Sequence, residues 1–324
     1  MAKRRTTETT RRMQTIIDTI NAPEYRDYWP LTVRQVYYHI RTLGQLPVVQ
    51  GSGKPVKDPY GCLSRLIDEM RIEDLIPWDA IEDSLRGIEQ EFVYTSRQEF
   101  YNIEKGSFLI GYQRDLMQSQ PRHIEVWTEK AALAHVFIRA AKPYRLPVLA
   151  TRGYSSTSAV NDYWGRLCKA YNDRKQYPLV FYFGDFDPEG MIIPDAAMRK
   201  LAKISGVETH EWLVRVALTE EQAKDDYSHC AESLDFGEDI KSESAKKRVQ
   251  NFKERYNTDT KVEVDAIPPS DLVTMAREAI ESALDIEAFE EEKEKEKEDL
   301  ALLQKARDLT LKRMRGGHGK NLGS

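Results

Sequence analysis

Residues 177–190 read YPLVFYFGDFDPEG, in which a mostly apolar run leads directly into Asp185 and Asp187. A short apolar run that ends in turn-forming residues is typical of a buried β-strand. Similar predicted strands cover residues 123–128, 146–151 and 211–218, and predicted helices separate them at 129–141, 158–171 and 193–205. This alternation predicts an α/β domain whose mostly parallel sheet is covered by helices on both faces.

Acidic residues directly follow two of these predicted strands. Glu129 comes after the first strand, and Asp185 and Asp187 come after the long apolar one. The carboxyl ends of parallel strands lie at one edge of a sheet, so we expect these three carboxylates to converge there. Hard oxygen ligands suit Mg²⁺, with Mn²⁺ as an alternative, and Glu189 is a further candidate ligand. Taken in isolation, a D-x-D pair is also typical of a turn or a helix cap.

A second candidate group lies on a predicted helix near the N-terminus. Its sequence is LTVRQVYYHIRTLG, residues 31–44. Thr32 and Gln35 form a T-x-x-Q capping box, which is typical of a helix start, and Gly44 is typical of a helix end.

Two adjacent tyrosines of this helix have different predicted environments. The apolar face holds, at helical spacing, Val33, Val36, Tyr37 and Ile40. Tyr37 is therefore predicted to face the core, whereas Tyr38 lies about 100° further round, on the face that carries Arg34 and Arg41. Nearby guanidinium groups would favour a phenolate and would also hold a phosphate. The periodicity favours Tyr38 as the free hydroxyl, although a pair of tyrosines on a helix is often structural.

The N-terminal region is predicted to be a small DNA-binding module. Helices are expected at residues 6–20, 32–44 and 58–70, followed by a short strand or wing at 76–83. Asp58 is the expected N-cap of the third helix. Helices followed by a small β element predict a helix-turn-helix or winged-helix (CAP-like) module over residues 1–90.

The rest of the chain is expected to divide into three parts. Residues 91–122 have a poor periodic signal and are expected to be a linker. The α/β domain is expected over residues 123–275, including a strand at 261–267. From Ser270 onward the sequence predicts one long charged helix, so that residues 276–324 form a charged helix with a flexible tail.

The 324-residue sequence has a net charge of −5 that is unevenly spread. Residues 281–299 hold ten acidic and three basic residues, whereas both ends of the chain are basic. This pattern allows a nucleic-acid partner but is equally expected of solvated surface charge. No apolar stretch approaches the ~20 residues that span a bilayer. The N-terminus lacks an apolar signal segment, and the cysteines form no C-x-x-C pair. We therefore expect a cytoplasmic protein with no membrane partner.

These features resemble known families of DNA enzymes. A glutamate after the first strand and a D-x-D after a later one look like a Toprim domain, the fold shared by topoisomerases, primases and related nucleases. E-K-x-A-L at 129–133, D-x-D-P-x-G at 185–190 and R-x-x-Y-Y at 34–38 are similar to the A subunit of archaeal topoisomerase VI and the related meiotic double-strand-break protein. The chain looks closest to the compact relatives called mini-A, and residues 280–324 lie outside the resemblance.

The resemblance implies a site and a reaction. Glu129, Asp185 and Asp187 would hold Mg²⁺ beside the scissile phosphate, and Tyr38, with Arg34 beside it, would be the nucleophile. Attack would leave a break linked to the protein through a 5′-phosphotyrosyl bond. One tyrosine cuts one strand, so a double-strand break requires a homodimer. In the family the tyrosine of one subunit works with the metal site of the other, and strand passage needs an ATPase B subunit.

Double-stranded DNA is therefore the expected substrate, in the nucleoid or, for a mobile element, in the host cytoplasm. Phosphate contacts are expected from Arg34, Arg41 and Lys130, and from the segment TRGYSSTS through Arg152, Ser155 and Ser156. Two other readings stay open. A hydrolytic Toprim nuclease, of the defence or plasmid-clearing type, would cut DNA without the tyrosine. A non-catalytic protein would bind DNA without cutting it.

Overall fold

The computed structural model describes residues 7–44, 58–81, 93–151, 157–234 and 243–316. Over these ranges the chain divides into two compact units. The first unit comprises residues 1–86 and 122–283, and the second comprises residues 87–121 and 284–324. The sequence predicts four consecutive parts instead. The segment expected as a linker groups with the C-terminal helix.

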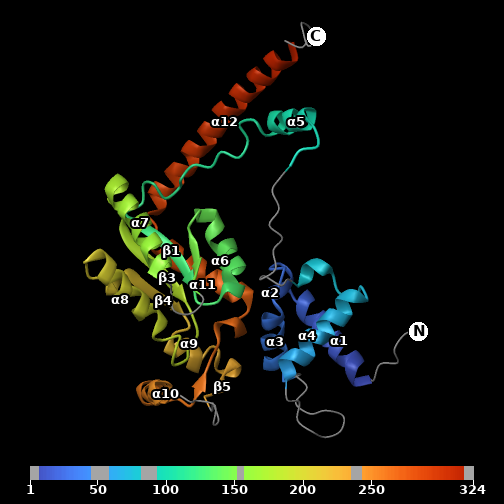
Figure 1. The fold of residues 1–324 in the computed structure, drawn as a ribbon, viewed down its shortest axis with the longest axis vertical. Helices are drawn as coiled ribbons and strands as arrows, with labels where there is room; N and C mark the ends of the chain where they lie inside the picture. The colour runs from blue at the N-terminus through green and yellow to red at the C-terminus, as the bar shows by residue number, and fades with distance from the viewer. Residues whose placement is uncertain (1–6, 45–57, 82–92, 152–156, 235–242, 317–324) are drawn as a thin grey trace. The chain divides into compact units, whose positions relative to one another are not determined.

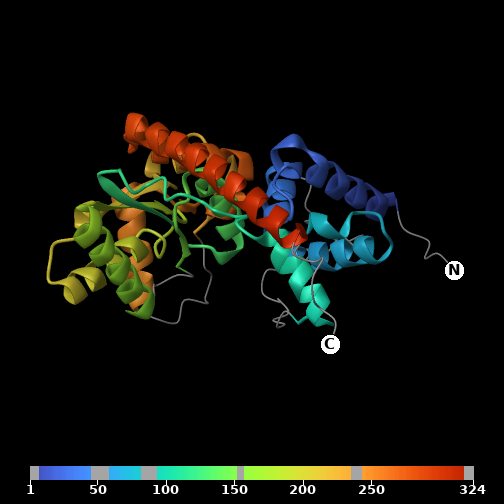
Figure 2. The same ribbon diagram turned by 90° about the horizontal axis from the view of Figure 1, so that it is seen from above.

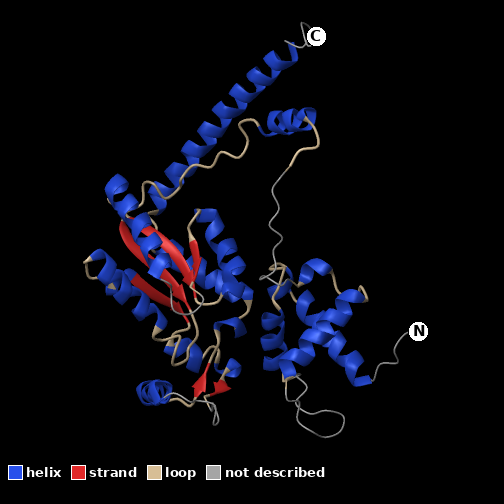
Figure 3. Cartoon of the chain, in the orientation of Figure 1, coloured by secondary structure: helices blue, strands red, loops and turns tan. Residues whose placement is uncertain are grey.

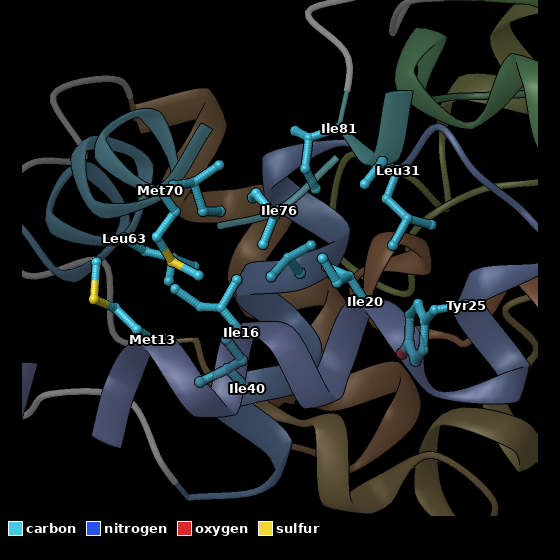
Figure 4. Close-up of a cluster of buried hydrophobic side chains, with 13 residues drawn as sticks. Met13, Ile16, Ile20, Tyr25, Leu31, Ile40, Leu63, Met70, Ile76 and Ile81 are labelled. Atoms are coloured by element: carbon cyan, nitrogen blue, oxygen red, sulfur yellow. The ribbon is translucent and has the colours of Figure 1, made fainter. Parts of the chain in front are cut away.

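The N-terminal part of the first unit is a helical cluster around an apolar core (Figure 4). Its helices are α1 (Thr7–Asn21), α2 (Pro23–Arg26), α3 (Val33–Thr42) and α4 (Pro59–Ile72). The buried side chains recur at helical spacing and include Met13, Ile16, Ile20, Ile40, Leu63, Ile67 and Met70. The helices predicted at residues 6–20, 32–44 and 58–70 are confirmed as α1, α3 and α4.

The predicted ends of these helices are also confirmed. Thr32 caps α3 in a capping box with Gln35, whose backbone N–H donates to Thr32 Oγ1 at 3.2 Å. Gly44 follows the helix with a φ of +64°, a left-handed conformation that glycine adopts at little cost. Asp58 caps α4 by accepting a hydrogen bond from the Gly61 N–H at 2.8 Å.

The strand expected at 76–83 is wrong for the residues described there. Trp78–Ala80 form the 3-10 helix η1, and Ile81 makes one parallel bridge to Leu31. Pro77 directly precedes η1, and proline has no N–H to donate to a strand ladder. The remainder of the expected wing, residues 82–83, lies outside the described residues, as does the rest of the expected module up to residue 90.

Within the described residues, four parallel strands form the sheet of the first unit, in the order β2–β1–β3–β4 (Figure 3). They are β1 (Arg122–Thr128), β2 (Val148–Ala150), β3 (Tyr177–Phe183) and β4 (Leu213–Ala217). The helices of this part are α6 (Ala134–Ala141), α7 (Thr157–Arg174), α8 (Ile193–Ser205), α9 (Glu220–Lys224), α10 (Glu243–Tyr256) and α11 (Pro269–Ser282). Short 3-10 helices also lie between these elements, among them η2 (Ala131–Leu133), η3 (Lys142–Tyr144), η4 (His210–Trp212) and η5 (Ser228–Cys230). The predicted parallel sheet is confirmed.

Helices cover both faces of this sheet, as predicted (Figure 1). On one face α6 and α11 pack together, and the ring centroids of Phe137 and Phe183 lie 4.4 Å apart. On the other face α7 and α8 pack against the neighbouring side chains of Trp127 and Tyr182. Successive residues of a strand point to opposite faces, so Tyr182 and Phe183 belong to different layers.

The chain after β4 departs from the prediction of a strand over residues 261–267. The elements here are β5 (Glu232–Ser233), the antiparallel β6 (Thr260–Lys261) and the 3-10 helix η7 (Val264–Ala266). The strand ends early because the acidic loop takes its hydrogen bonds. Val262 exchanges backbone hydrogen bonds with Phe186, and the Val264 N–H donates to the side chain of Asp185.

The second unit contains α5 (Arg97–Ser107) and α12 (Ile286–Gly316), a long helix that is unbroken in two views (Figures 1 and 2). The prediction of one helix from Ser270 onward is wrong, because α11 and α12 are separate. Asp285 starts α12 by accepting a hydrogen bond from the Ala288 N–H at 3.0 Å. The segment that precedes β1 attaches to α12 through Glu292, which accepts from Arg114 at 2.5 Å and from Ser119 at 2.7 Å.

Helix α5 is absent from the prediction, which treats this segment as a linker. None of its residues is buried in the structure. Its start has a recognisable signal: Ser96 caps the helix by accepting from the Glu99 N–H at 3.1 Å, in an S-x-x-E pattern. None of the helices in the described ranges is long and apolar enough to cross a membrane.

Candidate active site

The ends of β1 and β3 bring two carboxylates together. Glu129 follows β1 and Asp185 follows β3, and these strands are neighbours in the sheet. The Asp185 backbone N–H donates to Glu129 Oε2 at 3.1 Å, and the Glu129 N–H donates to the Phe183 carbonyl at 2.9 Å. Two of the three expected carboxylates therefore meet at the carboxyl edge of the sheet.

A half-buried arginine holds the acidic loop in place, and the sequence analysis does not predict it. The Arg215 guanidinium, from β4, donates to the backbone carbonyls of Gly184, Asp185, Gly190 and Leu218. The loop also needs glycine where other groups approach closely. A Cβ on Gly184 would lie 2.9 Å from Glu129 Oε2, and one on Gly190 would lie 2.4 Å from the Asp185 carbonyl oxygen. The loop conformation therefore depends on both glycines and on Arg215.

The two carboxylates lie in surroundings that penalise their charge. Glu129 is 9% exposed and Asp185 is 2% exposed. Burial and the neighbouring Asp185 raise the pKa of Glu129 to about 7, and burial also raises the pKa of Asp185. Lys130 offsets part of this negative charge, because its Nζ lies 2.5 Å from Asp185 Oδ2.

Two further acids reach the site from the segment after β6, and the sequence analysis does not predict them either. The Val264 N–H donates to Asp185 Oδ1 at 2.9 Å, which brings Glu263 and Asp265 to the acidic loop. Glu263 Oε2 lies 3.4 Å from Lys130 Nζ, and Asp265 is buried. The sequence pattern that could have predicted them is the alternation of acidic and apolar residues in KVEVDAI. This alternation puts both acids on one side of an extended chain.

Arg34 of α3 connects the candidate nucleophile to these acids. Its Nη2 donates to Tyr38 Oη at 3.3 Å and also pairs with Glu263, and its Nε lies 2.7 Å from Asp265 Oδ2. Tyr38 and the acidic set therefore lie in one cluster within the first unit, although they are far apart in the sequence. This arrangement is formed within one chain, whereas the resemblance implies a tyrosine from the other subunit.

Tyr38 is more enclosed than its position on the helix predicts. Tyr37 packs against the apolar core as expected, but Tyr38 is 6% exposed, so the prediction of a free Tyr38 hydroxyl is wrong. The reason is that η7 and Arg34 cover this face of α3. Burial raises the pKa of Tyr38 to about 12, and the opposing effects of Arg34 and Arg41 are smaller. Arg34 and Arg41 therefore favour the phenolate as expected, but burial outweighs them.

The other two expected metal ligands have structural partners. Asp187 caps the turn, since its Oδ1 accepts from the N–H groups of Glu189 at 2.9 Å and Gly190 at 2.6 Å. Glu189 Oε1 accepts from Arg248 of α10 at 2.7 Å. Among the residues that the structure describes, no three or more His, Cys, Asp or Glu side chains are arranged to hold one metal ion.

The cations expected to contact DNA are paired with acids of the same chain. Arg41 pairs with Glu232 of β5, while Arg34 and Lys130 pair with acids of the site. The other expected DNA contacts lie outside the described residues, namely Arg152, Ser155 and Ser156.

The chemistry of the site nevertheless fits a divalent cation. Glu129 and Asp185 supply hard oxygen atoms. The raised pKa of Glu129 reflects burial and repulsion from Asp185, and a bound cation would offset that repulsion. Asp265 Oδ1 is buried and has no hydrogen-bond partner among the described residues. A cation that used Asp185 Oδ2 would have to displace Lys130.

Comparison with known proteins assigns no family to this site. No protein-family model matches the chain, and no curated protein matches it either.

Proposed function

We propose that this protein is a DNA-cleaving transesterase similar to the topoisomerase VI A subunit, in which Tyr38 attacks a DNA phosphate. The observation that supports this most is the cluster in which Arg34 contacts both Tyr38 and Asp265, beside the acids at the ends of β1 and β3. On this proposal the N-terminal helices act as a winged-helix module and the sheet as a Toprim domain.

The reaction would exchange one phosphoester bond for another. Tyr38 Oη would bond to phosphorus, the bond from phosphorus to the 3′ oxygen would break, and the phenol proton would end on that 3′ oxygen. Arg34 would orient the phenol and bind the phosphate once its pairs with Glu263 and Asp265 loosen. The buried phenol must lose its proton as it attacks. Because its pKa is about 12, groups that the DNA brings close would have to help remove that proton.

Mg²⁺, or Mn²⁺ in its place, would supply positive charge beside the phosphoryl oxygens when bound. Glu129 and Asp185 are the residues that would hold it, with Asp187 as the next carboxylate along the same loop. Lys130 would move from Asp185 toward the phosphate. Arg215 would keep the loop carbonyls turned away from the incoming DNA.

Double-stranded DNA would be the substrate, and a homodimer would supply the two tyrosines that a double-strand break requires. Strand passage would further require an ATPase partner of the B-subunit kind. We place the protein with DNA in the cytoplasm.

The test is label transfer from end-labelled DNA to the protein in Mg²⁺ or Mn²⁺, read on a denaturing gel. We expect wild type to acquire label, and Tyr38→Phe and Asp185→Ala to lose it. Tyr37→Phe is the matched control, because the neighbouring tyrosine packs against the core and should leave the adduct intact. Label transfer that persists in Tyr38→Phe would contradict the proposal.

A hydrolytic nuclease is the second candidate, and the enclosure and raised pKa of Tyr38 favour it. In that reaction water attacks the phosphate, so free cut ends would form equally in wild type and Tyr38→Phe and would disappear in Glu129→Ala. Salt-dependent DNA binding without cutting under either metal would instead identify a non-catalytic DNA-binding protein.

A further inference from the structure

Three cations from separate segments of the first unit meet at the carboxylate of Glu263. Arg34 lies on α3, Lys130 follows β1, and Lys261 ends β6. Glu263 Oε2 pairs with the Arg34 guanidinium and lies 3.4 Å from Lys130 Nζ. Glu263 Oε1 accepts a hydrogen bond from Lys261 Nζ at 2.8 Å. The Glu263 side chain is 10% exposed, so the cations surround an anion that is largely withdrawn from water.

The three cations are close enough to repel one another. Burial lowers the pKa of the Lys261 ammonium, and the charges of Lys130 and Arg34 lower it further, against the opposing effect of the aspartates of the acidic loop. A bound anion relieves repulsion of this kind. The cations therefore form a site that favours an anion, and Glu263 supplies one from within the chain.

The Glu263 carboxylate lies beside the candidate nucleophile. Arg34 Nη2 donates to Tyr38 Oη at 3.3 Å, and the same nitrogen pairs with Glu263 Oε2. A carboxylate and a phosphodiester each spread one negative charge over two oxygens, and arginine binds both in the same forked manner. A phosphate in the position of this carboxylate would therefore lie next to the phenol of Tyr38.

Glu263 can leave this network without depriving any cation of its last acid. Each cation also pairs with a second acid. These pairs are Arg34 with Asp265 at 2.7 Å, Lys130 with Asp185 at 2.5 Å and Lys261 with Glu232 at 3.5 Å. Among the described residues, Glu263 is the acid that all three cations share. Because one negative charge would replace another, exchange of Glu263 for a phosphodiester leaves the net charge of the network unchanged.

We propose that Arg34, Lys130 and Lys261 form a site for one DNA phosphate, and that the Glu263 carboxylate fills this site when no DNA is bound. The identity of the ligand as DNA rests on the proposed function, whereas the competition between Glu263 and a phosphate does not. An incoming phosphate has to displace Glu263 before it reaches Tyr38. Glu263 therefore weakens binding and shields the tyrosine from other anions.

The first test uses inorganic phosphate as the probe and measures the melting temperature of the full chain, without metal or DNA, against chloride at equal ionic strength. Glu263→Gln keeps the size of the side chain but removes its charge. About 10 mM phosphate should raise the melting temperature of this variant by about 2 °C more than that of wild type. The double variant Glu263→Gln, Lys261→Met should lose the gain. Glu254→Gln is the control, because it removes one acid from the exposed face of α10 and should respond as wild type does.

The second test measures binding of a fluorescent DNA duplex by anisotropy in EDTA, where metal-dependent cleavage cannot occur. Glu263→Gln should lower the dissociation constant about tenfold, since a competing anion is gone. Lys261→Met should reduce the slope of log affinity against log salt concentration by about one. This variant leaves Glu263 in place, so an unchanged slope would overturn the proposal even if Glu263→Gln fails to fold.

The two tests separate this inference from the proposed function. Phosphate stabilisation of Glu263→Gln in a protein that binds no DNA would support the anion site and contradict the proposed function. Label transfer to Tyr38 in wild type, with no gain in either assay from Glu263→Gln, would support the proposed function and overturn the inference. An equal gain in Glu254→Gln would also overturn it, because the gain would then come from net charge alone.

Discussion

Strand β1 carries a buried glutamate in its middle and another just beyond its end, and their surroundings are opposite. Glu125 is fully buried and accepts from Arg166 at 2.7 and 2.9 Å, from His123 at 3.1 Å and from Trp127 at 3.1 Å. These hydrogen bonds outweigh burial and lower its pKa. Glu129 accepts from one backbone N–H of the acidic loop and faces a second carboxylate, so its pKa rises to about 7.

On this comparison Glu125 is a structural acid, and we propose that Glu129 is a functional one. A buried carboxylate that has its own cation and hydrogen-bond donors holds the fold together. A buried carboxylate placed beside another without enough donors costs stability, and its oxygens can bind an incoming cation. Glu129 is a carboxylate of this second kind, and it lies at the edge of the sheet near the cluster in which Arg34 contacts Tyr38.

The largest expected effect is a loss of stability when Glu125 is replaced. Glu125→Ala should lower the free energy of unfolding by about 3 kcal/mol, because it leaves the Arg166 charge and the buried Trp127 N–H without their acceptor. Urea denaturation followed by circular dichroism measures this. Label transfer per folded molecule should be unchanged, and a selective loss of transfer would show that Glu125 belongs to the functional site.

A substitution at Glu129 should change the free energy of unfolding in the opposite direction. Glu129→Gln should raise the free energy of unfolding at pH 8 by about 1–3 kcal/mol, because it removes a carboxylate whose charge the fold disfavours. The folded carboxyl binds its proton more tightly than the unfolded one. The stability of wild type should therefore fall as pH rises from about 4.5 to about 7.

Urea denaturation at pH 4 and pH 8 checks this pH dependence. The gain from Glu129→Gln should be present at pH 8 and absent at pH 4, where the carboxyl is protonated in both the folded and the unfolded state. Label transfer by this variant should be lost. Equal stability of the variant and wild type at pH 8 would contradict the account of Glu129 as an unsatisfied acid.

The smallest expected change in stability concerns the link to the tyrosine. Arg34→Lys keeps one positive charge near Asp265 but cannot also reach Tyr38 and Glu263 with a forked guanidinium. We expect about 1 kcal/mol lower stability and a loss of label transfer of about tenfold or more. Near wild-type transfer in Arg34→Lys would show that the positive charge suffices and that the guanidinium geometry does not matter.

Local sequence signals predict much of this fold. The apolar run before Asp185, the capping box at Thr32 and the alternation of strands and helices identify elements that the structure contains. Such signals lie within a few residues of one another, so they can be read without the tertiary structure. The convergence of Glu129 and Asp185 follows in the same way from the rule for parallel strand ends.

Contacts between distant segments account for what the sequence does not predict. Arg215 has a role because its guanidinium meets carbonyls of a loop that precedes it by about thirty residues. Asp265 belongs to the site because its segment pairs with the acidic loop, which also shortens the expected strand. Tyr38 is enclosed because η7 covers α3. Apart from the alternation of acidic and apolar residues in KVEVDAI, these contacts leave no periodic signal in the sequence.

The most direct measurement of the central claim is mass spectrometry of the protein after incubation with DNA and Mg²⁺, followed by nuclease and protease digestion. The account predicts a nucleotide mass on the peptide that contains residues 35–41, with fragment ions that assign it to Tyr38. A nucleotide on Tyr37 or on another residue, or DNA cut with no nucleotide attached to the protein, would contradict it.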